Sequence, residues 1–142
     1  GPQMSDILNK QSGLKALCGM SDLRDLEAAE ESGDKAASLA LRMFVYSIRK
    51  YIGAYFAVLG HVDAVVFTGG IGENSPKVRG AVCRDMAMFG IAIDEALNAP
   101  RSSSPRDLSL PDAKVRALVI PTDEELEIAR ATMRIAFPGK AC

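Results

Sequence analysis

The longest regular pattern of apolar residues runs over residues 35–59, where apolar side chains recur at helical spacing on two faces. Asp34 marks the start of this element, and Gly60 closes it. A helix of this length spans about 35–40 Å at a rise of about 1.5 Å per residue. Because apolar residues cover most of its circumference, we expect a central, largely buried helix.

Two shorter helical segments precede the long helix. The pattern predicts a short helix over residues 6–10 that ends at Ser12-Gly13. A second helix is predicted to begin after Ser21 as its N-cap and to continue through residues 26–31, where Ser32-Gly33 ends it. The order of elements therefore begins with helices, whereas the apolar segment over residues 14–20 is broken by Lys15 and Gly19.

A β-branched run over residues 62–68 is typical of a buried strand. It leads into the glycine-rich segment 69–74, which we expect to be a loop. Ser75-Pro76 then suit the N-cap and first turn of a helix that ends at Gly90. This is one strand–loop–helix unit.

A second unit of the same kind follows along the chain. The pattern predicts a short strand over residues 91–93, a turn over 94–98 and a surface loop over 100–111. A second buried strand over 115–120 then leads into a helix over 123–135. Two βα units predict an α/β architecture, with ligands at the carboxyl ends of the strands.

Composition narrows the functions that this fold is expected to serve. The 142 residues are 48% hydrophobic and 25% charged, which suits one domain or one lobe of a larger protein. Lys and Arg number 17 against 18 Asp and Glu, Trp is absent and aromatic residues make up 6%. This argues against nucleic-acid binding through positive charge or base stacking, and against polybasic membrane binding.

The cysteines and the single histidine limit the chemistry further. Cys18, Cys83 and Cys142 are odd in number and lack metal-ligand spacing, so we expect no zinc site or disulfide framework and a cytoplasmic location. His61 is the one histidine. No apolar stretch is free enough of charge to span a membrane, and no signal peptide is expected.

The segment VVFTGGIGEN, residues 65–74, is the strongest candidate for a ligand site. Its glycines let the backbone approach a ligand closely, and the helix that follows presents N–H groups that suit phosphate. No Lys-Ser/Thr pair follows, which excludes a Walker loop, and the glycine spacing is not the dinucleotide fingerprint. A tight turn without a ligand is the alternative, and Glu73-Asn74 favours a ribose or phosphate.

A second motif, VIPTDEEL, lies at the end of the second predicted strand. Thr122 and Glu125 have the spacing of a capping box, so Glu125 is interpreted as structural. Asp123 and Glu124 either complement the helix dipole or, if this turn faces the glycine-rich segment, hold Mg²⁺ on nucleotide phosphates. A third motif, Ser21-Asp22-Leu23-Arg24, on its own predicts only an N-cap with a surface ion pair.

Together these segments resemble the C-terminal part of the acetate kinase (acetokinase) family. The resemblance rests on DAVVFTGGIGENSPKVR, on KVRALVIPTDEELEIAR and, upstream, on SGLKALCGMSDLRDLE, and it covers residues 4–134. It implies the fold of the acetate and sugar kinase/actin superfamily, in which ATP lies between two lobes of ribonuclease-H-like topology. Residues 5–137 are then expected to form an incomplete second lobe, after a protease-cleavage scar and linker over 1–4 and before a frayed tail over 138–142.

Carried over position by position, the resemblance implies a nucleotide site for ATP or ADP. Asp22, Leu23 and Arg24 match the residues that contact adenosine in the family. The loop that wraps the adenine, ribose and α-phosphate is matched by Gly70, Ile71, Gly72, Glu73 and Asn74. Glu124 matches a glutamate associated with Mg²⁺.

The resemblance also implies what this chain lacks. The family's N-terminal lobe binds acetate and carries the phosphate motif, the catalytic arginines, the catalytic aspartate and a histidine that His61 does not match. We therefore expect no catalytic residue here and negligible activity of the chain alone. The implied parent reaction converts ATP and acetate to ADP and acetyl phosphate, and the family is expected to form homodimers.

Two alternatives remain open at this stage. One is a kinase for propionate or another short-chain carboxylate, since the acid binds in the absent lobe. The other is a non-catalytic nucleotide-binding or dimerisation module, in which the long apolar helix serves a subunit interface. The departures within the matched region are Ala16, Cys18 and the composition of the loop over residues 100–111.

Overall fold

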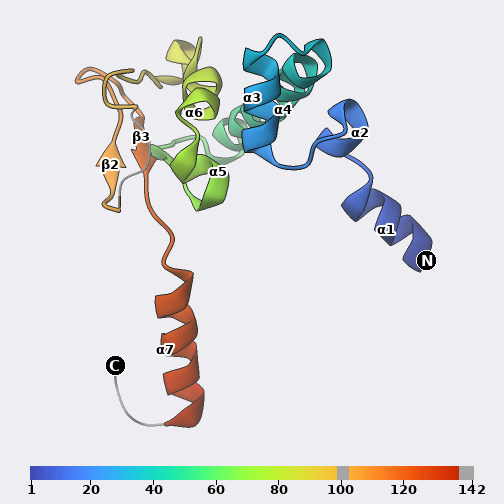
Figure 1. The fold of residues 1–142 in the computed structure, drawn as a ribbon. Helices are drawn as coiled ribbons and strands as arrows, with labels where there is room; N and C mark the ends of the chain where they lie inside the picture. The colour runs from blue at the N-terminus through green and yellow to red at the C-terminus, as the bar shows by residue number, and fades with distance from the viewer. Residues whose placement is uncertain (99–102, 138–142) are drawn as a thin grey trace.

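The computed structural model describes residues 1–98 and 103–137 (Figure 1). In the second part of the chain, helices alternate with the strands of a small sheet, in agreement with the predicted α/β class. The elements are α1 (Pro2–Lys10), α2 (Leu14–Cys18), α3 (Leu23–Glu31), α4 (Lys35–Leu59), β1 (Ala64–Phe67), α5 (Gly69–Asn74), α6 (Pro76–Cys83), the 3₁₀ helix η1 (Ala87–Phe89), β2 (Arg106–Asp107), β3 (Arg116–Val119) and α7 (Glu124–Ala136).

The sheet has the order β1-β3-β2. Strands β1 and β3 are parallel and in register, with Phe67 opposite Val119, so both strands end at the same edge. This confirms the two predicted strands, and their parallel pairing agrees with the predicted α/β architecture. The strand predicted over residues 91–93 is reduced to two isolated bridges, Ile91 to Val115 and Ile93 to Ser109.

Part of the predicted loop over residues 100–111 is a strand, so that expectation is wrong for β2. β2 pairs antiparallel with β3 through Arg106 and Asp107. Leu108, which follows, is fully buried, and its N–H donates to the carbonyl of Ala117 at 2.9 Å. Burial of this leucine draws the segment onto the sheet despite its polar composition. Residues 100–102 of the predicted loop lie outside the described residues.

Helix α4 has the predicted bounds, because the Asp34 carboxylate accepts hydrogen bonds from the N–H groups of Ala36 and Ala37 and Gly60 ends the helix. Helices α2, α3 and α6 pack along one side of it. The residues that this side buries are Ala37, Ala40, Leu41 and Val45. The expectation of burial around most of the circumference is wrong. Tyr51, Tyr55 and Val58 are 61–80% exposed, because no described element covers the opposite face.

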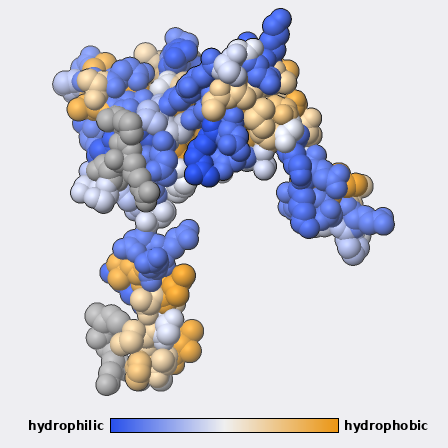
Figure 2. Space-filling model, in the orientation of Figure 1, coloured by the Kyte–Doolittle hydropathy of each residue, from blue (hydrophilic) through white to orange (hydrophobic). Residues whose placement is uncertain are grey.

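Helix α7 leaves the body of the molecule at the end of β3 and extends away from it (Figure 1). None of its residues is buried. Apolar side chains gather along the projecting helix (Figure 2), and Ile128 and Ile135 are 65% and 83% exposed. Helix α1 also projects, and it begins at Pro2, four residues before the predicted start.

The core lies between the sheet, α4 and α6. Its most deeply buried apolar members are Leu26, Val82, Ile91, Leu108 and Val119. Strand β1, expected to be buried, is an edge strand of the described sheet, and of its residues only Phe67 is buried. Among the helices that the structure describes, none combines the length and apolar character that crossing a membrane requires.

Candidate functional site

The Ser21–Arg24 motif begins helix α3, with Asp22 rather than Ser21 as the N-cap. The Asp22 carboxylate accepts a hydrogen bond from the Arg24 N–H at 2.9 Å and pairs with the Arg24 guanidinium at 2.6 Å. These Arg24 hydrogen bonds lower the pKa of Asp22 to about 2. The predicted surface ion pair of Asp22 is thus confirmed, although it joins residues two positions apart. The prediction of Ser21 as the N-cap is wrong, because Asp22 takes that place.

The glycine-rich segment is a short helix, α5, and not the predicted loop. Gly69 starts it with a positive φ of 69°, which glycine adopts at little cost. The Ser75 N–H donates to the Ile71 carbonyl at 3.0 Å, and the Asn74 side chain donates to the Gly70 carbonyl at 2.7 Å. These bonds within the turn offset the low helix propensity of its glycines.

A cavity of about 600 Å³ lies between the start of α3 and α5. This volume is in the range of sites that hold small molecules. Its walls are formed by Ser21, Asp22, Leu23, Arg24, Glu27, Gly70, Ile71, Asn74 and Ser75. Six of the eight residues predicted to contact a nucleotide therefore surround one cavity, although the two segments are far apart in sequence.

The two glycines of the motif have different surroundings. Gly70 lines the cavity, and a Cβ built on it meets no atom within 4 Å. A Cβ on Gly72 would lie 3.0 Å from the carbonyl carbon of Phe67, so this glycine lets α5 pack closely against β1. Gly72 and Glu73 are the two predicted contact residues that do not line the cavity.

Glu73 links the two sequence motifs instead. Its side chain is buried, and Oε1 accepts hydrogen bonds from the Gly69 N–H at 2.9 Å and from the Thr122 N–H and hydroxyl, both at 2.8 Å. The carboxylate thereby joins the ends of β1 and β3. Its contact with a nucleotide stays a prediction.

The predicted capping box of Thr122 and Glu125 is wrong. Helix α7 has Asp123 as its N-cap, whose Oδ1 accepts a hydrogen bond from the Leu126 N–H at 2.9 Å. The hydroxyl of Thr122 donates to Glu73 instead, which leaves the next residue to cap the helix. Glu125 is exposed and holds no cap.

Glu124, the predicted magnesium ligand, is the first residue of α7. It is exposed and does not line the cavity. In the part of the chain that the structure describes, no group of three or more His, Cys, Asp or Glu side chains is placed to hold a metal ion. Mg²⁺ is commonly held by one or two carboxylates together with substrate phosphates. A single carboxylate at this position therefore fits only a Mg²⁺ site that the nucleotide phosphates complete. The assignment of Glu124 stays a prediction.

Arg79 is a structural residue for which the sequence predicted no role. It is fully buried on α6, and Nη1 donates to the carbonyls of Gly72 and Glu73 at 2.8 and 2.9 Å. Its Nε donates to Asn98 at 2.9 Å. Burial lowers the pKa of the guanidinium from its usual value. The side chain thus holds the carbonyl end of α5, and a charged residue among the apolar positions of the helix is the sequence signal for it.

His61, for which no role in the site was predicted, lies at the surface. Its ring is 82% exposed and pairs with Asp63 at 2.9 Å. The histidine is not among the residues that line the cavity, whose polar groups are hydroxyl, carboxylate, guanidinium, amide and backbone groups.

Comparison with known proteins identifies relatives over nearly the whole chain. A family model described as the Acetokinase family matches residues 2–130. The acetate kinase of Nitratidesulfovibrio vulgaris is 56% identical over 135 residues, which are 95% of this chain and 33% of that protein. The crystal structure of Porphyromonas gingivalis acetate kinase matches with a TM-score of 0.86 at 44% identity, over 96% of this chain and 34% of that chain.

A propionate kinase is also among the similar structures. The crystal structure of the enzyme from Francisella tularensis matches with a TM-score of 0.81 at 35% identity, over 91% of this chain and 33% of that chain. The chain spans about a third of the length of these relatives.

Proposed function

Because the chain belongs to the acetokinase family, we propose that it supplies the nucleotide-holding wall of a kinase that transfers a phosphoryl group between ATP and acetate. The fold is that of the acetate and sugar kinase/actin superfamily, of which the chain holds an incomplete lobe. The observation that carries the proposal is the cavity between α3 and α5, where two separate motifs meet.

The residues around the cavity suit an adenine nucleotide. Leu23 and Ile71 provide apolar surface for a base, and the Asn74 amide and the Arg24 guanidinium provide hydrogen-bond donors. Gly70 adds no side chain, so a ligand can lie directly against the backbone of α5. Phosphoryl transfer depends mainly on positioning and on charge neutralisation, and such a wall contributes positioning.

Glu124 is the residue that we propose as the protein ligand of Mg²⁺. When bound, the ion neutralises charge on the nucleotide phosphates. Glu124 is the first residue of α7, and Thr122 two residues earlier is joined to Glu73, which follows β1. This link holds the beginning of α7 to the edge of the sheet from which the α5 motif also leaves.

The proposal is tested by calorimetric titration of the chain with ADP and Mg²⁺. Gly70→Leu fills the cavity without meeting protein atoms at the Cβ position, so it is expected to abolish binding while the fold persists. Ala57→Leu, on the exposed face of α4, is the control and is expected to bind like the parent chain. Absence of binding by the parent chain, or equal binding by Gly70→Leu, would contradict the proposal.

We further propose that the chain alone has negligible kinase activity. The resemblance assigns acetate binding and the residues that stabilise the transferred phosphoryl group to the part of the relatives that this chain does not span. A coupled assay with ATP, Mg²⁺ and acetate is expected to show no turnover above that of a Glu124→Ala variant. Turnover above that control would overturn this part of the proposal.

A propionate kinase is the second candidate, favoured by the match to the Francisella tularensis structure. The cavity described here cannot distinguish the two acids, because it is proposed to hold the nucleotide. A module that only dimerises is the remaining alternative, and the exposed apolar face of α4 is the observation in its favour. A tight dimer that does not bind ADP would support it.

A further inference from the structure

Glu27, the last residue of the segment SGLKALCGMSDLRDLE, was assigned no role from the sequence, and it also lines the cavity. It lies on α3 four residues after Leu23, and residues at this spacing share one face of a helix. The start of α3 therefore directs both an apolar and a carboxylate side chain to the cavity. Glu27 is partly buried at this position.

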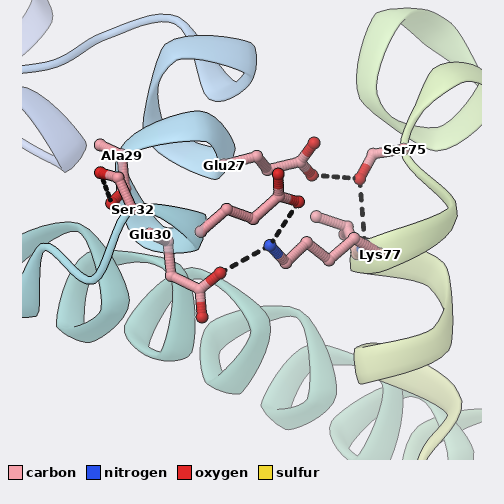
Figure 3. Close-up of polar contacts among 8 residues, drawn as sticks. Glu27, Ala29, Glu30, Ser32, Ser75 and Lys77 are labelled. Carbon is pink, nitrogen blue, oxygen red and sulfur yellow. Dashed lines mark hydrogen bonds and ion pairs between the residues drawn. The ribbon is translucent and has the colours of Figure 1, made fainter.

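A hydrogen bond from the opposite wall fixes the Glu27 side chain. The Ser75 hydroxyl donates to Glu27 Oε1 at 2.5 Å, and Ser75 is only 4% exposed (Figure 3). The same hydroxyl oxygen accepts a bond from the Val78 N–H at 3.0 Å, which fixes the direction of the hydroxyl proton. The carboxylate is thus held between α3 and the start of α6.

The neighbouring carboxylates are paired with cations, and Glu27 is not. Lys77 pairs with Glu30 at 2.6 Å and with Glu31 at 3.1 Å (Figure 3). Within residues 1–98 and 103–137, no ion pair involves Glu27. The other carboxylate at the cavity, Asp22, has both oxygens engaged by Arg24. Of the two carboxylates that line the cavity, Glu27 is therefore the one with acceptor positions that no cation engages.

The chemistry of a free carboxylate selects the part of a nucleotide that it can bind. An ionised carboxylate accepts hydrogen bonds and donates none, and it repels a phosphate. The ribose offers two adjacent hydroxyl donors, and carboxylates recognise ribose hydroxyls in dinucleotide sites. Resting on the proposed function, we propose that Glu27 is a ribose-binding residue, whose carboxylate accepts hydrogen bonds from the ribose hydroxyls of the nucleotide.

The test compares ADP with 2′,3′-dideoxy-ADP, which lacks both hydroxyls, by calorimetry in the presence of Mg²⁺. The parent chain is expected to bind ADP about ten-fold or more tightly than the dideoxy analogue. In Glu27→Ala the ratio of the two affinities, ADP over the dideoxy analogue, is expected to approach one, because ADP binds more weakly. Glu27→Gln keeps an acceptor for Ser75 and the shape of the side chain, and it is expected to lose most of the ratio while keeping the fold.

Glu30→Gln is the matched control, because Glu30 pairs with Lys77 and does not line the cavity. Its ratio is expected to equal that of the parent chain. If the parent chain binds ADP but its ratio is near one, or is unchanged in both Glu27 variants, the inference is wrong and the proposed function stands. If the Glu27 variants instead lose discrimination between ADP and inosine diphosphate, the carboxylate reads the base and the ribose assignment is wrong. If the parent chain binds neither nucleotide, the proposed function itself fails.

Discussion

Oε1 of Glu73 accepts two hydrogen bonds from Thr122, one from its N–H and one from its hydroxyl, each 2.8 Å long. The two residues are 49 positions apart and follow the two parallel strands of the sheet. This contact explains how the two motifs beyond β1 and β3 are held together.

Thr122→Val is expected to lower the free energy of unfolding by about 1–2 kcal/mol, because it removes the hydroxyl donor and leaves the buried carboxylate one bond short. Urea denaturation measures the change. Thr68→Val is the matched control, since the Thr68 side chain makes no capping bond to α5, and its effect is expected to stay within about 0.5 kcal/mol. Equal effects of the two substitutions would contradict a role for the Thr122 hydroxyl.

Substitutions at the two glycines of α5 are expected to have opposite effects. Gly72→Ala places a Cβ 3.0 Å from the backbone of Phe67 and is expected to destabilise the chain by about 1–3 kcal/mol. Gly70→Ala meets open space and replaces a helical glycine, so we expect it to be neutral or to stabilise by up to about 1 kcal/mol. Denaturation midpoints measure both. A stable Gly72→Ala would show that the close approach of α5 to β1 is not needed.

Arg79→Met is expected to destabilise the chain by about 2–4 kcal/mol. The substitution leaves the carbonyls of Gly72 and Glu73 without their buried donor. Arg84→Met is the control, because Arg84 is an exposed residue at the C-terminal end of the same helix. Its effect on the free energy of unfolding is expected to stay within about 0.5 kcal/mol. Urea denaturation measures both variants. Comparable losses of stability would argue against a role of the Arg79 hydrogen bonds in holding α5.

Cys83 is expected to make stability fall at alkaline pH. Burial raises the pKa of its thiol from 9.0 to about 11, so the folded state retains a proton that the unfolded state loses as the pH rises above 9. The stabilisation is complete below pH 9 and is lost as the pH rises to about 11, a change of about 2–3 kcal/mol. Unfolding free energies of the parent chain and Cys83→Ala at several pH values measure this difference, and parallel pH profiles would contradict it.

Predictions from the sequence were confirmed where residues close together in the chain determine the structure. The bounds of α4 follow from the Asp34 cap and the Gly60 stop, and Ser75-Pro76 begin α6 as predicted. The parallel pairing of β1 and β3 follows from two strand–helix units that run in one direction.

The predictions that were wrong concern groups whose contacts are made by residues far away in the sequence. Thr122 and Asp123 are both able to cap α7, and the choice is made by Glu73, which engages the Thr122 hydroxyl. The burial of α4 depends on which elements cover it, and the described elements cover one face. No role was predicted for Glu27, because only the fold brings α3 to the same cavity as α5 and places Glu27 beside Ser75.

The most direct test of the central claim is the mapping of amide chemical shifts in the isotopically labelled chain during titration with ADP and Mg²⁺. Saturable shifts are expected to gather at residues that line the cavity, among them Asp22, Leu23, Arg24, Gly70, Ile71 and Asn74. Shifts that gather instead at the separate groove of Arg42, Arg49 and Arg84, or the absence of any saturable shift, would contradict it.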